Sequence, residues 1–164
     1  MEKIDKSLLD RVSANAMASP RKRKNYNFHK EYPDPLQRML NAIEPWSYIQ
    51  PHKHENPDKV EAFVVLKGRL LVLEFGTTGL ITDSTVIDPS QGIYGAEIPP
   101  CTFHMIIALE PGTVVYEIKN GPYSPINDKN WAPWAPREGE EGTREFMRRI
   151  IDQLQLDCPP PGHD

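Results

Sequence analysis

The stretch from Phe28 to Lys119 constrains the fold most, because it consists of short apolar runs separated by turn-forming residues. No long helical period interrupts these runs, and their length and spacing are typical of β-strands. The clearest hairpin joins Leu70–Phe75 to Leu80–Ile87. Glycines in the connecting segment Gly76-Thr77-Thr78-Gly79 supply the positive φ angles that a tight reversal needs. We therefore predict an all-β centre.

The N-terminal end predicts one short helix. Leu8 and Val12 fall on one helical face, and Ser7 with Asp10 can form a capping box. The helix should end near Ser19-Pro20, because the residue before proline is disfavoured in the α region.

The C-terminal end predicts a second helix. Phe146, Ile150 and Leu154 recur at helical spacing after a candidate N-cap at Thr143. The preceding segment 122–136 is rich in proline and tryptophan, which opposes regular structure there.

Charge and composition exclude several classes of partner. The formal net charge is −4 and the basic run Arg21–Lys24 adjoins no other basic segment, so we expect a solvated or internally paired run and no nucleic-acid partner. No window approaches the roughly 18 consecutive apolar residues of a membrane span, and Met1–Asp10 lacks the apolar region of a signal peptide. We expect no membrane partner and a cytoplasmic protein. Cys101 and Cys158 lie in unlike contexts, which favours free thiols.

Two histidines and a glutamate indicate a metal site. His52 and His54 are two residues apart, so a strand presents both imidazoles on one face. Glu61 follows nine residues after His52, an odd separation that would place it on the opposite face of an uninterrupted strand. The turn signal Glu55-Asn56-Pro57-Asp58 resets the count, so Glu61 can face the histidine pair from the next strand.

A third histidine completes the predicted ligand set. His104 opens the apolar run Phe103–Leu109 directly after Ile98-Pro99-Pro100, and Ile106 and Ala108 should share its face. Three imidazoles and one carboxylate suit one divalent ion, with iron, zinc, nickel or manganese as candidates and copper also compatible. A six-coordinate ion would keep two positions open for a ligand.

The strand that begins at Glu61 has two apolar faces. Phe63 and Val65 share the face of Glu61, while Val64 and Leu66 lie on the other. A strand of this kind is buried on one side and covered on the other by a terminal helix or a second subunit. We expect a homodimer.

These residues resemble the two signatures of the cupin superfamily. His52, His54, Glu61 and Gly68 match the first signature, although the gap from histidine to glutamate is longer than usual. The second signature matches around His104, but Cys101 stands where glycine is usual and alanine stands where asparagine is usual. The resemblance implies a double-stranded β-helix, the cupin jelly-roll barrel.

A closer resemblance, from Ser19 to about Glu138, is to the WbuC family of cupin-fold metalloproteins found beside bacterial polysaccharide genes. It rests on the strings SPRKRKNYNFH, QRMLNAIEPWSYIQPHKH and DK…APWAP. The resemblance implies a bacterial protein with a bound metal and a sugar-derived ligand. It also implies that one block of residues belongs to the site: Asn25, Asn27, His29, Gln37 and Arg38.

The expected organisation has three parts. Residues 1–24 form the N-terminal helix and basic linker, and residues 25–138 form the metal-binding barrel with its Pro/Trp-rich closing segment. Residues 139–164 form the C-terminal helix and tail.

Three residues are candidates for catalysis. Arg38 has the planar guanidinium that recognises an anionic or polyhydroxylated ligand, and a surface ion pair is the alternative. His29 and Tyr48 could exchange a proton beside the ion. An ordinary strand aromatic is the alternative for Tyr48.

Two functions fit these residues. In the first, the protein is an enzyme that chelates a small sugar or hydroxy acid and performs isomerase, epimerase, lyase or oxygenase chemistry. In the second, it is a metal-dependent small-molecule binding module or sensor without turnover.

Overall fold

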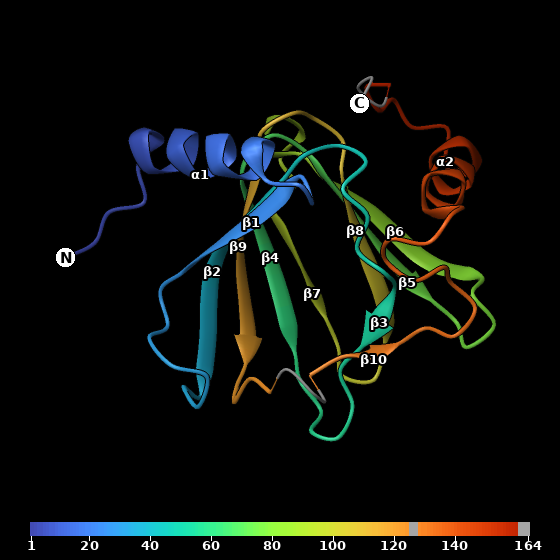
Figure 1. The fold of residues 1–164 in the computed structure, drawn as a ribbon, viewed down its shortest axis with the longest axis horizontal. Helices are drawn as coiled ribbons and strands as arrows, with labels where there is room; N and C mark the ends of the chain where they lie inside the picture. Colours follow the sequence, from blue (N-terminus) through green and yellow to red (C-terminus); the bar gives the residue numbers. More distant parts are fainter. Residues whose placement is uncertain (125–127, 161–164) are drawn as a thin grey trace.

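Two antiparallel sheets face each other in the computed structural model, which describes residues 1–124 and 128–160 (Figure 1). One sheet has the strand order β1-β2-β9-β4-β7 and the other has the order β10-β3-β8-β5-β6. In chain order the elements are α1 (Lys6–Ala18), β1 (Arg23–Asn27), β2 (Leu36–Ile43), β3 (His52–Lys53), β4 (Glu61–Lys67), β5 (Leu70–Phe75), β6 (Ile81–Ile87), the 3-10 turn η1 (Pro89–Gln91), β7 (Gly95–Ile98), β8 (Phe103–Ala108), β9 (Thr113–Asn120), β10 (Asn130–Trp131) and α2 (Thr143–Gln153).

Period-two alternation divides each strand between two environments. In β8, Ile106 and Ala108 join the core between the sheets, while Met105 and Ile107 join a second cluster outside it. The same alternation sends Val115 of β9 inward. β8 carries a continuous apolar run because both of its faces are covered.

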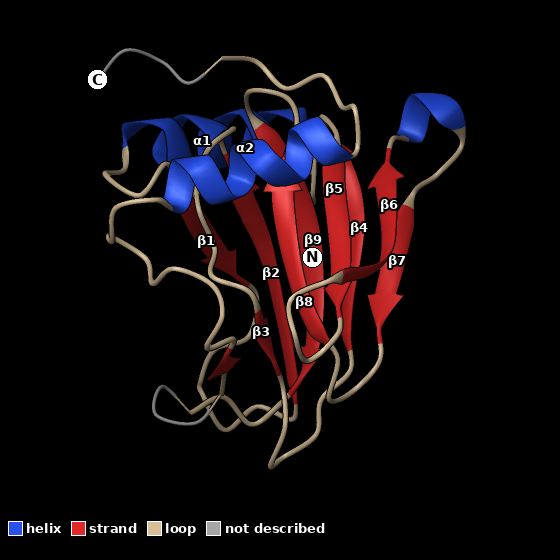
Figure 2. Cartoon of the chain, turned by 90° about the vertical axis from the view of Figure 1, so that its right-hand side faces the viewer, coloured by secondary structure: helices blue, strands red, loops and turns tan. Residues whose placement is uncertain are grey.

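The two helices cover the outer faces of different sheets (Figures 1 and 2). Met147 and Ile151 of α2 pack with the outward residues of β5 and β8. Leu8 and Val12 of α1 pack against Leu40 of β2 and its neighbours. Both helices were predicted from their apolar spacing, and the amphipathic faces are the ones that the structure buries.

The helix caps differ from the prediction. Asp5, rather than Ser7, caps α1, and its side chain accepts a hydrogen bond from the Leu8 amide at 3.0 Å. Gly142, rather than Thr143, is the N-cap of α2, in a left-handed conformation with φ of 91°. The C-terminal end of α1 agrees with the prediction, because its C-cap is Ser19, directly before a proline.

Strand structure extends beyond the predicted centre at both ends. β1 begins at Arg23, inside the segment expected to be a linker, because it completes the edge of a sheet by pairing with β2. The short β10 lies within the proline-rich segment and pairs with β3, with Trp131 opposite His52. Residues 125–127 of that segment lie outside the described residues.

The turn between β4 and β5 requires its glycine. Gly68 has φ of 78°, and a Cβ there would lie 2.3 Å from Thr113 Oγ1 and 3.0 Å from Thr113 Cα. Left-handed backbone and close approach both exclude a side chain. Gly68, the glycine of the first cupin-like signature, therefore allows the turn at which the strand that carries Glu61 ends.

Part of the outer face of β4 remains uncovered. Val64 and Leu66 are 37% and 38% exposed, and α1 packs on β2 and β9 rather than on this strand. The expected cover by a terminal helix is wrong for these two side chains. Among the described residues, no helix is long and apolar enough to cross a membrane.

Candidate metal centre

Four buried side chains from both sheets meet at one end of the barrel. His52 of β3 pairs directly with His104 of β8 in one sheet, while Glu61 opens β4 in the other. His54 follows β3, and the turn before Glu61 resets the strand as the sequence predicts. One ligand atom from each of these residues lies within 4.8 Å of the corresponding atom of every other, and each residue is at most 4% exposed.

Backbone carbonyl groups fix the orientation of all three imidazoles. Nδ1 of His52 lies 3.0 Å from the Gln50 carbonyl oxygen, and Nδ1 of His104 lies 2.9 Å from that of Thr102. Nδ1 of His54 lies 2.5 Å from the Asp128 carbonyl oxygen. A carbonyl oxygen only accepts, so each Nδ1 carries the proton and donates it. In the neutral rings, each Nε2 therefore presents a lone pair, as in metal-ligating histidines.

The contacts at Glu61 fit a bound cation. Its Oε2 lies 2.9 Å from His104 Nε2 and 3.1 Å from His54 Nε2. Lone pairs on both atoms of such a contact repel, so a proton or a metal ion must lie between them. His52 Nε2 is buried with no hydrogen-bond partner among the described residues, which favours the ion. Two atoms bound at about 2.1 Å and at a right angle lie about 3.0 Å apart, close to both separations.

Protonation states also favour ligation. Burial, followed by the charge of Lys129, holds the pKa of His52 well below its usual value, so the ring is neutral at neutral pH. Burial by itself raises the pKa of Glu61, but the neighbouring Lys119 charge opposes burial, and that pKa lies well below its usual range. A neutral imidazole and an ionised carboxylate are the ligand forms that bind metals.

A buried ion cluster supports this end of the barrel. Asp128 accepts hydrogen bonds from Lys119 at 2.8 Å and from Lys59 at 2.6 Å. The backbone carbonyl of the same aspartate accepts the bond from His54, so the cluster and the imidazole share one residue. Lys119 also pairs in register with Glu61 across β9 and β4. The cluster thereby ties the strand ends to the four-residue centre.

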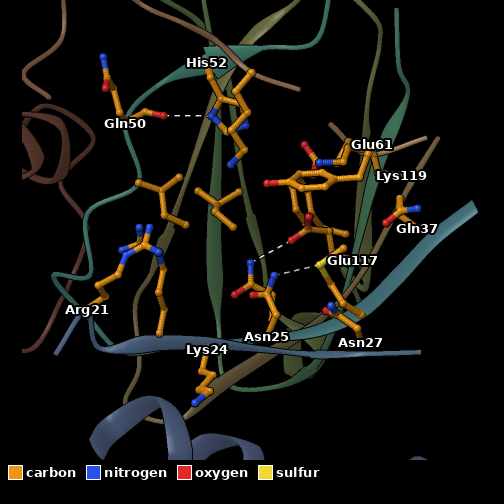
Figure 3. Close-up of a pocket in the computed structure, with 18 of the residues that line it drawn as sticks. Arg21, Lys24, Asn25, Asn27, Gln37, Gln50, His52, Glu61, Glu117 and Lys119 are labelled. Carbon is orange, nitrogen blue, oxygen red and sulfur yellow. Dashed lines mark hydrogen bonds between the residues drawn. The ribbon is translucent and has the colours of Figure 1, made fainter. Parts of the chain in front are cut away.

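The centre opens into a pocket of about 830 Å³ that runs between the sheets. Figure 3 shows His52 on one side of the pocket and Asn25 and Asn27 on the β1 side, opposite it. Asn41, which also lines the pocket, donates through Nδ2 to Glu117 Oε2 at 2.9 Å. Burial and the neighbouring Glu61 charge raise the pKa of Glu117 to about 7. The pocket therefore joins the four-residue centre to a wall that carries the amides of Asn25, Asn27 and Asn41.

One family model matches the N-terminal part of the sequence. The family model described as "Domain of unknown function (DUF6016)" matches residues 4–87, which is about half of the chain. The chain belongs to this family. No curated protein matches the sequence.

Solved structures similar to this DUF6016 member share its fold at low sequence identity. An oxalate oxidase in complex with the substrate analogue glycolate has a TM-score of 0.53 and 14% identity, over 86% of this chain and 69% of that one. The protein TT1209 from Thermus thermophilus has a TM-score of 0.52 and 17% identity, over 73% and 97%. The capsular polysaccharide assembling protein CapF from Staphylococcus aureus has a TM-score of 0.51 and 18% identity, over 66% and 31%, so this chain spans about a third of CapF. The fold is the cupin jelly roll.

The structure separates the three predicted catalytic residues. His29 lines the pocket, and its Nδ1 lies 3.1 Å from the Arg38 amide nitrogen and 3.0 Å from the Arg38 carbonyl oxygen. Either tautomer thus finds a backbone partner at Nδ1. Arg38 does not line the pocket, because Gln37 and Met39 on either side of it in β2 point inward.

Tyr48 is also absent from the pocket lining. Its hydroxyl donates to the Pro136 carbonyl oxygen at 2.6 Å, and its ring contacts Phe146 of α2 in an edge-on arrangement. The alternative interpretation, an aromatic that packs the structure, describes this side chain. The expected proton transfer by Tyr48 is not compatible with its position.

Other predicted features have mixed outcomes. Asn25, Asn27 and Gln37 line the pocket, as the family resemblance implies. Cys101 has φ of 62°, the left-handed conformation that favours glycine, so the position keeps the usual backbone geometry of the second signature without its usual residue. Both cysteines are free thiols, as expected. Arg21 and Arg23 of the basic run pair with Glu138, which confirms internal pairing for those two.

Sequence reasoning missed most of the charged residues around the centre, namely Lys59, Lys119, Asp128 and Lys129. Lys119 alternates with Glu117 on the inward face of β9, and two charges at this spacing in an apolar strand were a usable signal. Asp128 and Lys59 come from loops, where no period predicts the direction of a side chain. Lys129 lines the pocket from the closing segment and was missed for the same reason.

Proposed function

We propose that this protein binds one divalent metal ion through His52, His54, Glu61 and His104, and that the ion holds a small ligand in the barrel pocket. The observation that carries the proposal is the convergence of three carbonyl-oriented imidazoles on one buried carboxylate, with His52 Nε2 left without a partner among the described residues. Ligands of this type suit iron, zinc, nickel or manganese.

The ligand in this proposal is a sugar-derived compound or a hydroxy acid, as in a WbuC-type role in bacterial polysaccharide metabolism. A bound divalent ion supplies Lewis-acid polarisation of a chelated oxygen. The pocket residues orient the ligand, and His29 is the candidate to exchange a proton with it, since it is buried and lines the pocket. Arg38 and Tyr48 have no part in this proposal because neither lines the pocket.

A non-catalytic binding module or sensor is the second candidate. His29 discriminates between the two functions. An isomerase, epimerase, lyase or oxygenase that depends on this side chain should lose turnover in His29→Gln while the ligand still binds. A binding module should show metal-dependent ligand binding without product in either protein.

Metal analysis tests the first proposal. Purified protein loaded with excess ion and desalted should hold about one ion per chain, and a His52→Ala, His104→Ala double variant should hold none. His29→Gln is the matched control, because this buried histidine lines the same pocket outside the four-residue centre. Full retention of the ion in the double variant contradicts the ligand assignment.

A homodimer is part of the proposal. The half-exposed Val64 and Leu66 on the outer face of β4 support it, since a partner could cover them. Light scattering should give twice the chain mass of 18.7 kDa. Val64→Glu should shift the mass to that of a monomer, and a monomeric wild type contradicts the dimer.

A further inference from the structure

Three of the cations that line the pocket contact a carboxylate. Arg21 and Arg23 are held by Glu138, with nitrogen to oxygen distances of 2.7 Å, so neither fork is free. Lys119 is held by Asp128. Each of these cations already has a carboxylate partner.

The two remaining lysines differ in direction. Lys24 belongs to β1, and Figure 3 shows its side chain pointing away from the pocket, toward α1. Lys129 lines the pocket and makes no ion pair with a carboxylate of the described residues. Its ammonium lies 5.4 Å from the centroid of the Trp131 ring.

Lys129 is placed at the metal end of the pocket. The residue is two positions before Trp131, whose ring centroid lies 5.4 Å from that of His52. Its charge is near enough to lower the pKa of His52. Burial lowers the pKa of Lys129 itself, while the charges of Glu61, Glu117 and Asp128 act in the opposite direction. A buried ammonium with no carboxylate in direct contact is stabilised by an anion that reaches it. A divalent ion in the neighbouring centre adds positive charge and strengthens that demand.

The β1–β2 side of the pocket carries a hydrogen-bond acceptor that lacks a donor among the described residues. Asn41 is 6% exposed and donates through Nδ2 to Glu117, but its Oδ1 is buried without a hydrogen-bond partner among the described residues. Asn25, Asn27 and Gln37 line the same side of the pocket. A buried amide oxygen needs a donor, and a hydroxyl group of a ligand supplies one. Several neutral amides together suit a chain of hydroxyl groups.

We propose that the pocket selects a polyhydroxylated carboxylate, a sugar acid, whose carboxylate end lies between the metal centre and Lys129 and whose hydroxyl groups bind Asn41 and the neighbouring amides. Lys129 and Asn41 are then the residues that determine specificity. This inference rests on the proposed function, because the carboxylate end requires the ion. Apart from Lys24, which points away, Lys129 is the one cation among the described lining residues without a carboxylate contact, and this favours a singly charged carboxylate over a phosphate. The volume of about 830 Å³ is within the range of small-molecule sites.

Titration calorimetry on the metal-loaded full chain tests the inference with matched probes. D-Gluconate carries both features, glucitol has the same hydroxyl chain without the carboxylate, and glycolate has the carboxylate with a single hydroxyl. Gluconate should bind at least tenfold more tightly than either, and more tightly than glucose 6-phosphate. Equal affinity for gluconate and glucitol, or tighter binding of the phosphate, overturns the proposal.

Variants assign the two ends. Lys129→Gln should reduce the affinity for gluconate at least tenfold, while Lys24→Gln, the matched control on the outer side of β1, should leave it unchanged. Asn41→Leu should weaken gluconate but not glycolate. An unchanged gluconate affinity in Lys129→Gln overturns the assignment of Lys129 as the residue that binds the carboxylate. Circular dichroism checks the folding of each variant, and the Lys129→Gln result decides this point even if Asn41→Leu does not fold.

Metal content measured on the same samples distinguishes a failure of the proposed function from a failure of the sugar-acid inference. A wild type that binds no ion contradicts the proposed function. A wild type that holds one ion per chain but does not discriminate among the probes contradicts the sugar-acid inference alone.

Discussion

The two ends of the pocket are built in opposite ways. At the metal end every imidazole is oriented by a backbone carbonyl, and Asp128 holds two buried lysines. At the β1–β2 end, Asn25 contacts the Met39 sulfur at 3.1 Å, and Asn41 leaves its oxygen without a partner among the described residues. A rigid end suits an ion with fixed geometry. An end with buried polar atoms that lack hydrogen-bond partners suits a ligand that supplies those partners.

The largest expected effect is at the support of the metal end. Asp128→Asn leaves the ammonium groups of Lys59 and Lys119 buried without their carboxylate, so the free energy of unfolding should fall by about 3–5 kcal/mol. Chemical denaturation measures the change. A loss below about 1 kcal/mol, the value for an exposed pair, means that the two ends do not differ in rigidity.

Substitutions of the two carboxylates that line the pocket near the centre should differ in their effect on metal affinity. Glu61→Gln removes a charged ligand and should weaken the affinity by about 100-fold, which is about 2.7 kcal/mol. Glu117→Gln, the matched change, keeps an acceptor for Asn41 and should alter affinity less than about threefold. Competition with a chromophoric chelator measures both. Equal losses indicate that the ion does not lie at the four-residue centre.

Cys101 offers a smaller test at the same end. Replacing it by glycine removes a left-handed non-glycine residue with φ of 62° and should raise stability by about 0.5–1 kcal/mol. Metal affinity should stay the same, because His104 is oriented by Thr102 rather than by Cys101. A fall in stability contradicts the view that this position only needs glycine geometry.

The smallest effect is expected at the rim, where Arg21 and Arg23 bind Glu138. Burial raises the pKa of Glu138, but the contacts with both arginines outweigh burial and lower it. A lowered folded-state pKa stabilises the protein above the unfolded value of 4.5 and loses that contribution as pH falls through the folded value.

Because this carboxylate is partly exposed, Glu138→Gln should cost less than about 1 kcal/mol at pH 7. The stability of the variant should also decline less than that of the wild type as pH falls below the unfolded value of 4.5. If the free energy of unfolding falls equally in the two proteins as pH is lowered, the contribution of Glu138 is contradicted.

Sequence patterns predicted the features that follow from the two-residue period of side chains along a strand. The separation of His52 from His54, the turn before Glu61 and the inward face of Ile106 follow from a period of two, and the structure agrees with each. The hairpin through Gly76–Gly79 follows from turn chemistry in the same way. These features depend on neighbours in the chain, so a single sequence can reveal them.

The remaining site features depend on contacts between distant segments. Arg38 was placed by resemblance in the pocket, although the parity of β2 turns it away from Gln37 and Met39. Lys129 and Asp128 come from a loop, where no period fixes direction. Their positions are set by pairing of β10 with β3 and by the buried ion cluster, neither of which leaves a local pattern.

Anomalous diffraction from a crystal grown with manganese or nickel tests the central claim most directly. We predict one peak per chain, at about 2.0–2.3 Å from the Nε2 atoms of His52, His54 and His104 and from an Oε atom of Glu61. A peak elsewhere in the chain, or no peak in crystals whose dissolved protein contains one ion per chain, contradicts the metal centre.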